Sequence, residues 1–448
     1  MVTWKQLQTK KMTVNKLVKV IGGGLAGSEC ALALAKRGYK VLLYDMKPIK
    51  KSPAHHMDTL CELVCSNSLK SVALSTGSGV LKKELELLGS EVLLSANECA
   101  VPAGHALAVD RDKFSALVHQ KLIDFGVEIK AELVSEIDEE CTTVIATGPL
   151  TDSALEPVIE KISGKRPYFF DAAAPIVTGE SIDMNRAFFG GRYGKGGDDY
   201  LNLPMTKEEY LNFYNELINA ECAIIKDFEG EEVFEGCMPV EIMAKRGEDT
   251  LRFGPLRPVG FGRREERPYA VLQLRREDKD GRLYNLVGFQ THLKFPEQKR
   301  VFSLIPGLKG AEFVRYGVMH RNTYIKSPDI VDESLSVKDR PNVYFAGQIT
   351  GVEGYVESIM SGLCVALAIV GKDKGFSLNL PKESITGSLI NYVVNGFGED
   401  YQPVNANFGI LPELDQKYRD KELRKQAYAD RAIKAIDQYA KWRKDNGI

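Results

Sequence analysis

The chain has 448 residues, a formal net charge of −2 and 44% hydrophobic residues. This length predicts two or three domains, and the near-neutral charge excludes binding to nucleic acid through overall charge alone, although a local basic face remains possible. The first residues contain lysines without the apolar stretch of a secretory signal, and no uninterrupted apolar run is long enough to span a membrane. We therefore predict a cytoplasmic protein with no membrane contact.

The first predicted elements form a nucleotide-binding unit. A buried strand is expected over Leu17–Ile21, a helix from about Leu25 to Arg37 and a second strand from Lys40 to Tyr44. The turn between strand and helix reads G-x-G-x-x-G, and an acid ends the second strand. This context predicts a pyrophosphate at the helix N-terminus and ribose hydroxyls at the acid. The predicted cofactor-binding residues here are Gly22, Gly23, Gly24, Leu25, Ala26, Gly27 and Asp45.

The next stretch, CELVCSNSLK, contains two cysteines whose role the local sequence leaves open. A reducing cytoplasm argues against a structural disulfide between Cys61 and Cys65, and no second Cys/His pair supplies zinc-ligand spacing. An FAD-dependent disulfide reductase is an alternative, but such enzymes generally use C-x-x-C or C-x₄-C pairs. Cys65 precedes Ser66, Asn67 and Ser68, which can hydrogen-bond a thiolate or a ligand.

Two later segments are predicted to return to the nucleotide domain. CTTVIATGPL contains a β-branched strand that runs into Ala146, Thr147 and Gly148, and residues 342–371 contain a strand, a glycine-rich turn and a long apolar helix. The pair resembles two-dinucleotide-type flavoproteins, in which the dipole of the late helix favours negative charge on the flavin. This resemblance favours FAD over NAD. The corresponding predicted cofactor residues are Gly347, Gln348, Gly354 and Tyr355, with Gln348 where an acid is usual.

The remaining chain is predicted to form an insertion and a C-terminal helix. Between residues 188 and 323 the sequence contains short strand-like runs, two of which are separated by the turn-forming stretch EDKDGRL, as in a β-hairpin. This pattern indicates an inserted α+β domain. The predicted fold is therefore α/β, a Rossmann-like two-dinucleotide-type FAD domain made of residues 1–187 and 324–448, which the insertion at 188–323 interrupts. The final stretch, from about Glu413, is predicted to be an amphipathic packing helix, with an RNA-facing surface as the alternative.

Several unusual motifs resemble the folate- and FAD-dependent tRNA (uracil-5-)-methyltransferase family, TrmFO. The matching words include VIGGGLAGSE, SPAHH, ELVCSNSL, VPAGHALAVDRDKF, FEGCMPVE, VGFQTHLK and FAGQITGVEGYVES, and they extend along nearly the whole chain. The resemblance implies FAD, 5,10-methylenetetrahydrofolate as carbon donor and NADPH or NADH as electron source. It also implies methylation at C5 of the T-loop uridine of tRNA, although a ribosomal RNA uridine is not excluded.

The resemblance also implies catalytic residues. Cys237, in FEGCMPVE, is predicted to attack uracil C6, and Cys65 to lie near the flavin. His292 is a candidate to stack on the pterin, with Lys294 or Arg275 near the glutamate tail. No metal ion and no obligate protein partner are predicted. The rival functions are a related FAD protein that modifies wobble uridines, and a flavoprotein that binds RNA without catalysis.

Overall fold

The first sheet has six strands in the order β16-β17-β7-β1-β2-β6, as seen in the computed structural model. This structure describes residues 16–52, 54–164, 168–172, 174–194, 197–223, 238–261, 267–278, 280–317, 319–396 and 401–448. All neighbouring strands of this sheet are parallel except β16, which is antiparallel to β17. The strands are β1 (Leu17–Ile21), β2 (Lys40–Asp45), β6 (Glu128–Ala131), β7 (Thr142–Ile145), β16 (Ser336–Val337) and β17 (Arg340–Phe345).

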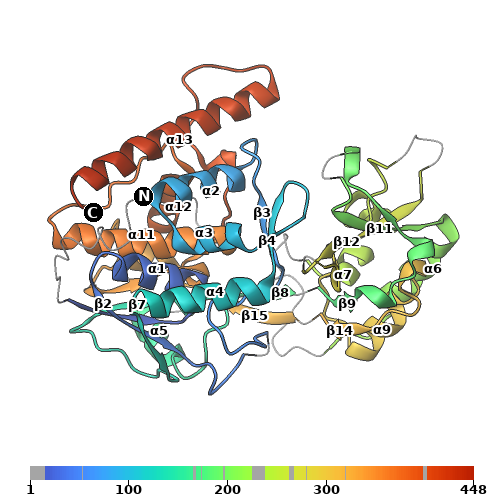
Figure 1. Ribbon diagram of the computed structural model, residues 1–448, viewed down its shortest axis with the longest axis horizontal. Helices are drawn as coiled ribbons and strands as arrows, with labels where there is room; N and C mark the ends of the chain where they lie inside the picture. Colours follow the sequence, from blue (N-terminus) through green and yellow to red (C-terminus); the bar gives the residue numbers. More distant parts are fainter. Residues whose placement is uncertain are drawn as a thin grey trace, which may run out of the picture.

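Helices cover this sheet and contribute to the first of two large hydrophobic cores (Figure 1). They are α1 (Leu25–Ala35), α2 (Gly77–Leu88), α3 (Glu91–Glu98), α4 (Arg111–Asp124), α5 (Glu156–Ser163), α10 (Ser327–Ile330), α11 (Tyr355–Asp373), α12 (Ile385–Asn395) and α13 (Lys421–Asp445). The predicted β1–α1–β2 unit is confirmed, with one difference. Helix α1 ends at Ala35, because the chain already turns toward Gly38, whose φ is +86°.

Helices α1 and α11 lie in direct contact at the centre of this core. A Cβ atom added to Gly362 would lie 2.1 Å from the carbonyl oxygen of Ala26, so the glycine permits this close approach. Helix α11 is long and apolar enough to cross a membrane by composition, but 89% of its most apolar stretch is buried inside the protein. Among the described helices it is the one that meets this criterion, and its burial is that of a core helix.

The second sheet has the strand order β10-β11-β12-β13-β9-β14 and its own hydrophobic core. Its strands are β9 (Ile176–Thr178), β10 (Phe188–Phe189), β11 (Tyr200–Met205), β12 (Ala270–Arg276), β13 (Leu283–Leu286) and β14 (Phe313–Arg315), and its helices are α6 (Lys207–Ile218), α7 (Val240–Lys245), α8 (Thr250–Phe253) and α9 (Phe295–Phe302). In Figure 1 this unit forms the right-hand side of the molecule. The predicted hairpin between β12 and β13 is confirmed.

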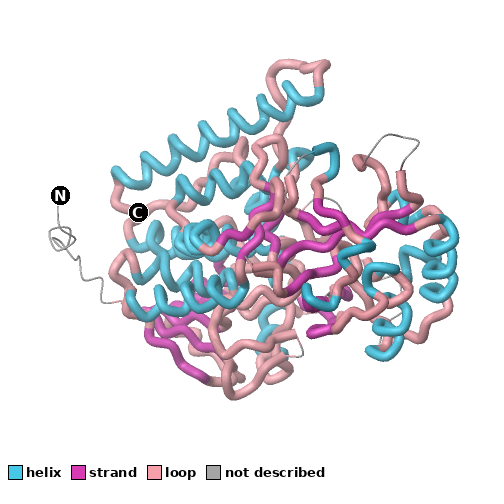
Figure 2. Tube along the Cα trace, turned by 45° about the vertical axis from the view of Figure 1, so that its right-hand side comes forward, coloured by secondary structure: helices cyan, strands magenta, loops and turns pink. Residues whose placement is uncertain are grey.

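Two smaller sheets complete the fold. One pairs β8 (Tyr168–Ala172) with β15 (Met319–Thr323), and the other contains β3 (Ser68–Ser71), β5 (Ala106–Val109) and β4 (Ala100–Val101). In the tube view of Figure 2, one group of strands lies below the left-hand helices and others extend from the centre of the molecule towards its right-hand side. Strand β9 pairs within the second sheet although it precedes residue 188. The domain limits at residues 187 and 323 remain predictions.

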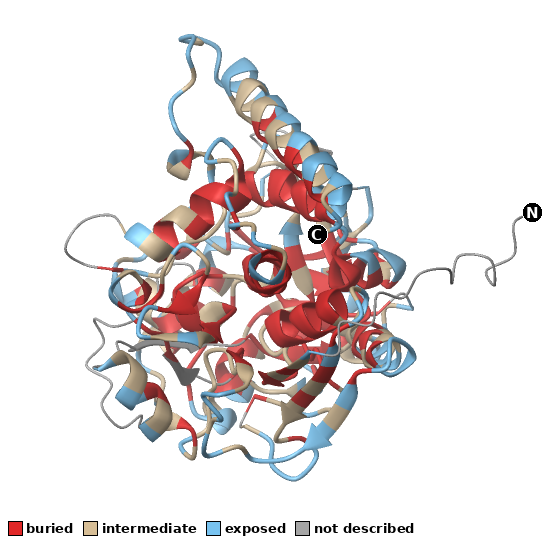
Figure 3. Ribbon diagram, turned by 90° about the vertical axis from the view of Figure 1, so that its left-hand side faces the viewer, coloured by how far each residue is buried: buried red, intermediate tan, exposed pale blue. Residues whose placement is uncertain are grey.

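The C-terminal helix α13 packs on the first core. It begins at Lys421, later than Glu413, because the Asp420 side chain caps it by accepting hydrogen bonds from the backbone N–H groups of Glu422 and Leu423, each at 2.8 Å. Ile436 and Tyr439 are buried, whereas the outer face of the helix is exposed (Figure 3). The predicted packing role is confirmed.

Candidate cofactor and thiol site

The glycines of the first turn serve two different purposes. Gly22 has φ +102°, and a Cβ atom there would lie 2.5 Å from the carbonyl oxygen of Ala146. A Cβ atom on Gly27 would lie 1.8 Å from the carbonyl oxygen of Gly22. These two positions therefore let the turn, α1 and β7 approach one another closely. Gly24 differs, because a Cβ atom there would meet no atom within 4 Å.

Gly24 is the N-cap of α1 and faces a cavity at the carboxyl ends of the first-sheet strands. No side chain caps the helix, so its first N–H groups and its dipole point toward this cavity. The carboxylate of Asp45 accepts hydrogen bonds from the N–H of Gly23 at 2.7 Å and from the N–H of Lys47 at 2.9 Å. Other lining residues include Gly22, Met46, His55, Glu62, Ala146, Thr147 and Thr151.

This arrangement fits the ADP half of a dinucleotide. An uncapped helix N-terminus binds a pyrophosphate, the open Gly24 leaves room for it, and a carboxylate at the end of β2 binds ribose hydroxyls. The structure brings together the predicted Gly22, Gly24, Asp45, Ala146 and Thr147 at one cavity. Gly23 lies in the turn before α1, Leu25, Ala26 and Gly27 are the first residues of α1, and Gly148, with φ +67°, lies in the turn after β7.

The late glycine turn lies against α1. Gly347 has φ +84°, and a Cβ atom there would lie 2.7 Å from the Cβ of Ala26. Gln348, which occupies the position where an acid was expected, donates a hydrogen bond at 2.6 Å to the carboxylate of Glu353. An acid is thus present in this turn, five residues later in the chain. Glu353 was not predicted from the sequence although it lies within the same motif, because its contact with Gln348 depends on the shape of the turn.

Tyr355, at the start of α11, contacts the Cys65 loop, which we define as residues 61–67. Its hydroxyl oxygen accepts hydrogen bonds from the backbone N–H of Cys65 at 2.8 Å and of Ser66 at 3.1 Å. Burial raises the pKa of Tyr355, so the phenol is neutral at physiological pH. The N-terminus of α11, which follows Gly354 with φ +127°, is therefore hydrogen-bonded to the backbone of Cys65 through the Tyr355 side chain.

Arginines also hold the Cys65 loop. Arg275, in β12, donates to the hydroxyl of Ser66 at 2.6 Å and to the side-chain oxygen of Asn67 at 2.9 Å. Arg315, in β14, donates to the carbonyl oxygen of Val64 at 2.7 Å. Arg275 therefore contacts the thiol loop, and its predicted place near a glutamate tail gains no support from these contacts.

Arg111, at the start of α4, adds a third guanidinium. It donates to the carbonyl oxygen of Leu63 at 2.8 Å and forms a buried ion pair at 2.7 Å with Glu277, which follows β12. The residues that contact the Cys65 loop therefore come from elements of both large units. The guanidinium groups of Arg111, Arg275 and Arg315 place positive charge near Cys65. Nothing local in the sequence marks the three arginines as partners of one loop.

The two cysteines of the CELVCSNSLK motif have different surroundings. Cys61 is fully buried, and this burial raises the pKa of its thiol, whereas Cys65 is partly exposed. No disulfide joins any two of the seven cysteines in the described residues. This geometry does not favour a redox pair of Cys61 and Cys65, because the thiol of Cys61 is inaccessible and hard to ionise.

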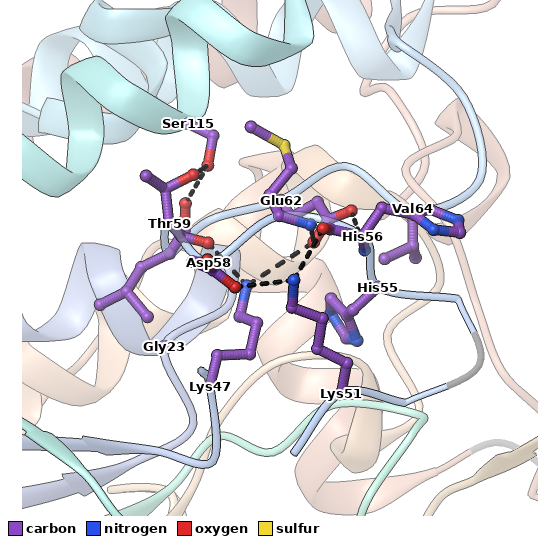
Figure 4. A network of polar contacts seen from close by, with 12 residues as sticks. Gly23, Lys47, Lys51, His55, His56, Asp58, Thr59, Glu62, Val64 and Ser115 are labelled. Atoms are coloured by element: carbon purple, nitrogen blue, oxygen red, sulfur yellow. Dashed lines mark hydrogen bonds and ion pairs between the residues drawn. The ribbon is translucent and has the colours of Figure 1, made fainter. Parts of the chain in front are cut away.

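A polar network fixes the chain between the cofactor cavity and the thiol loop (Figure 4). Lys47 donates to the carbonyl oxygen of Thr59 at 2.7 Å and lies 3.7 Å from the carboxylate of Glu62, and both side chains are buried. Glu62 also accepts from the N–H of His56 at 2.8 Å. Burial, followed by the charge of Lys47, lowers the pKa of His55 to about 4, so a neutral imidazole lines the cavity.

His292 lies in the second unit, in a buried polar cluster. Its Nδ1 atom is 2.5 Å from the carboxylate of Glu241, which also accepts from the hydroxyl of Thr291 at 2.8 Å. Burial lowers the pKa of His292, but the Cys222 thiol and Glu241 outweigh it and raise the value to about 9. Donor atoms of Cys222, Glu241 and His292 lie within 4.8 Å of one another, a grouping that was not predicted from the sequence. Stacking on a pterin stays a prediction, as does the absence of a metal.

The predicted nucleophile Cys237 lies outside the described residues. Met238, the residue after it, begins the described segment that leads into α7 and lines a surface hollow together with Met243 and Phe253. The position of this thiol relative to Cys65 is therefore still a prediction.

Fold and cavity together define a dinucleotide-binding α/β protein with a second α+β unit. The family described as Glucose inhibited division protein A matches residues 17–377. Structures of GidA from Aquifex aeolicus, in two crystal forms, share the fold with TM-scores of 0.69 and 0.68 at 15% and 16% identity, over 98% and 97% of this chain and 75% and 76% of theirs.

Closer relatives identify the family. The methylenetetrahydrofolate--tRNA-(uracil-5-)-methyltransferase TrmFO of Acetivibrio thermocellus is 55% identical over 94% of this chain and 98% of its own length. The protein of the same name from Natranaerobius thermophilus is 53% identical over 94% and 98%. The chain belongs to the TrmFO family.

Proposed function

We propose that this chain is an enzyme that methylates C5 of a uridine in tRNA, with 5,10-methylenetetrahydrofolate as carbon donor. The observation that carries the proposal is the identity of more than half of the residues, over nearly the full length, with relatives that bear this activity in their names. The dinucleotide cavity and the adjoining Cys65 loop support it, because this chemistry needs a bound redox cofactor beside reactive groups.

The proposed reaction balances with one reduced nicotinamide. The methylene carbon of the folate is at the oxidation level of formaldehyde, so its transfer as a methyl group requires two electrons and a proton from NADPH or NADH. FAD, when bound, supplies the carrier for these electrons. The first-turn glycines and Asp45 would hold its ADP half, and the turns at Gly148, Gly347 and Gly354 would hold the remainder.

We assign the uracil chemistry to Cys237. Uracil C5 is a weak nucleophile, and addition of a thiolate at C6 makes it an enolate that can accept the one-carbon unit. Loss of the C5 proton releases the carbon from its carrier as an exocyclic methylene on C5, and addition of the hydride that originates from the nicotinamide, with expulsion of the thiolate from C6, then gives the methyl group and restores the aromatic base. Cys65 is assigned to the cofactor side, where Tyr355 and Arg275 fix its loop. His292 is assigned to the folate.

Labelled methylenetetrahydrofolate tests the proposal directly. Purified protein loaded with FAD, NADPH and an unmodified tRNA transcript should place the label in 5-methyluridine. Parallel reactions with NADH, or with a ribosomal RNA fragment, separate the nicotinamide and RNA alternatives. Absence of label in every RNA, with a bound and reducible flavin, would refute the function.

Cysteine variants test the assigned roles. Cys237→Ala should abolish transfer, and normal turnover in that variant would disprove the nucleophile. Cys141→Ala is a matched control, because this partly exposed thiol directly precedes β7, lies 3.7 Å from the carbonyl oxygen of Leu17 and is not among the residues that line the cavity. It should retain wild-type activity.

The proposed substrates also suggest where the protein acts. A tRNA substrate and a soluble folate are consistent with a cytoplasmic enzyme. We propose that no obligate protein partner is needed, which the reconstituted reaction above would establish.

A further inference from the structure

One edge of the second sheet carries exposed aromatic rings next to arginines. Phe188 and Phe189 form the edge strand β10 and are 37% and 38% exposed, and Tyr193 just beyond it is 61% exposed. Arg257 donates a hydrogen bond to the Tyr193 hydroxyl at 3.3 Å. Successive residues of a strand point to opposite faces, so Phe188, which pairs with Asn202, shares the face of Gln273, whereas Phe189, under the guanidinium of Arg276 at 5.4 Å, points to the other face. We call Phe188, Tyr193 and Arg257 the aromatic–arginine surface. Strands β11 and β12, on which it rests, are labelled in Figure 1.

Side chains beneath this surface hold it in place. Arg192 donates to the side chain of Gln273 at 2.8 Å and lies over the Phe261 ring at 5.0 Å, and Phe261 in turn packs edge-on against Phe188. Tyr193 has φ +58°, a left-handed conformation that is unfavourable for a tyrosine, and its N–H donates to Gly260 at 2.9 Å. The fold thus holds a bulky ring outward at an energetic cost.

The surface lies close to the Cys65 loop. Gln273 and Arg275 are two residues apart on β12, so their side chains share one face about 7 Å apart. Gln273 supports Arg192, which precedes Tyr193, whereas Arg275 donates to Ser66 at 2.6 Å. The two contacts connect the aromatic–arginine surface and the thiol loop through two positions on the same face of a single strand.

The chemistry of the surface fits RNA with unpaired bases. Aromatic faces stack on bases of any sequence, and arginines bind phosphates and stack on bases as well. The carboxylate of Asp199 is directed to the N–H of Gly104, at 2.5 Å.

We propose that the aromatic–arginine surface binds unpaired nucleotides of the RNA that flank the target uridine. The proposal rests on the proposed function, since it names the place where that substrate is held. A flipped uridine leaves neighbouring bases unstacked, and exposed rings a short distance from the thiol loop replace the lost stacking.

Binding of an unmodified tRNA transcript, followed by fluorescence anisotropy at several salt concentrations, tests the proposal. Tyr193→Ala should weaken binding about fivefold or more, the loss expected for one base–aromatic stack. Arg257→Gln should lower the slope of log affinity against log salt by about one. Phe125→Ala, an exposed ring at the end of α4, and Arg340→Gln, at the start of β17, are matched controls and should bind as the wild type does.

The outcomes separate this proposal from the function. If the wild type binds and methylates the transcript and Tyr193→Ala does so with equal affinity, the surface proposal is wrong and the function stands. If the wild type neither binds nor methylates any RNA, both fail. A Tyr193→Ala variant with unchanged affinity for the transcript but an altered oligomeric state on size-exclusion chromatography would identify the surface as a contact between copies, and would overturn the RNA assignment.

Discussion

Gly27 and Gly24 belong to the same G-x-G-x-x-G motif, but the addition of one methyl group should destabilise the fold at Gly27 and leave it intact at Gly24. In Gly27→Ala, the new Cβ would lie 1.8 Å from a backbone carbonyl oxygen, well inside contact distance, so α1 must move away from β1. Overpacking of this kind costs about 1–3 kcal/mol and sometimes more. In Gly24→Ala, the Cβ meets nothing and the backbone is extended, with φ −76° and ψ −167°, so the protein should fold normally.

The same Gly24→Ala methyl group should block the approach of a phosphate to the helix N-terminus. Loss of one hydrogen bond to a charged group corresponds to about 1.5–3 kcal/mol, which is about 10- to 150-fold in FAD affinity. FAD removed by dialysis and titrated back, with the quenching of its fluorescence as signal, measures the affinity, and thermal unfolding of the apoprotein measures the fold. Gly310→Ala, where the added Cβ also meets nothing, is the control.

An FAD-affinity measurement on Gly24→Ala and a thermal midpoint for Gly27→Ala can each contradict these predictions. Wild-type FAD affinity in Gly24→Ala would mean that the pyrophosphate does not lie at this turn. A wild-type thermal midpoint in Gly27→Ala would mean that the close approach of the turn to α1 is not required for stability.

Three further predictions concern the contacts between elements. Glu277→Gln leaves a buried arginine without its carboxylate, so unfolding in denaturant should show a loss of about 3–5 kcal/mol, and an unchanged midpoint would contradict the burial of this pair. Because the pKa of His292 is raised to about 9, its ion pair with Glu241 stabilises the fold fully below about pH 6.5, and this stabilisation is lost as pH rises through 9. Glu241→Gln should flatten that region of the pH–stability curve, and NMR titration of the imidazole should show a lower pKa. Gly362→Ala should separate α11 from α1 and lower the thermal midpoint, with Gly310→Ala again as control.

Local patterns predicted the nucleotide unit well. The strand at Leu17–Ile21 was placed correctly, and the strand ending at Asp45 was placed to within a residue, because glycine spacing, apolar runs and a terminal acid are all encoded within about thirty residues. The C-terminal helix was predicted with its packing face, but it begins later than predicted. The prediction of its start followed the amphipathic pattern and did not use Asp420, whose side chain caps the helix.

The surroundings of Cys65 could not be predicted in this way. Arg275 and Arg315 are separated from their partners in the Cys65 loop by more than two hundred residues, and no periodic pattern records such a pairing. Glu353 was missed for a related reason, because the position expected to carry the acid holds Gln348 and the compensating contact depends on the shape of the turn. Buried polar contacts across the chain are set by the tertiary fold.

The arginine contacts of the Cys65 loop have a consequence for how the protein is made. This loop leaves the ribosome early, yet Arg275 and Arg315 are synthesised much later, and Tyr355 later still. Until those residues emerge, the loop has its contact with Arg111 at Leu63 but lacks the partners of Val64, Cys65, Ser66 and Asn67 that come from the later chain. The thiol therefore acquires all the contacts that fix its position only when most of the chain has been translated.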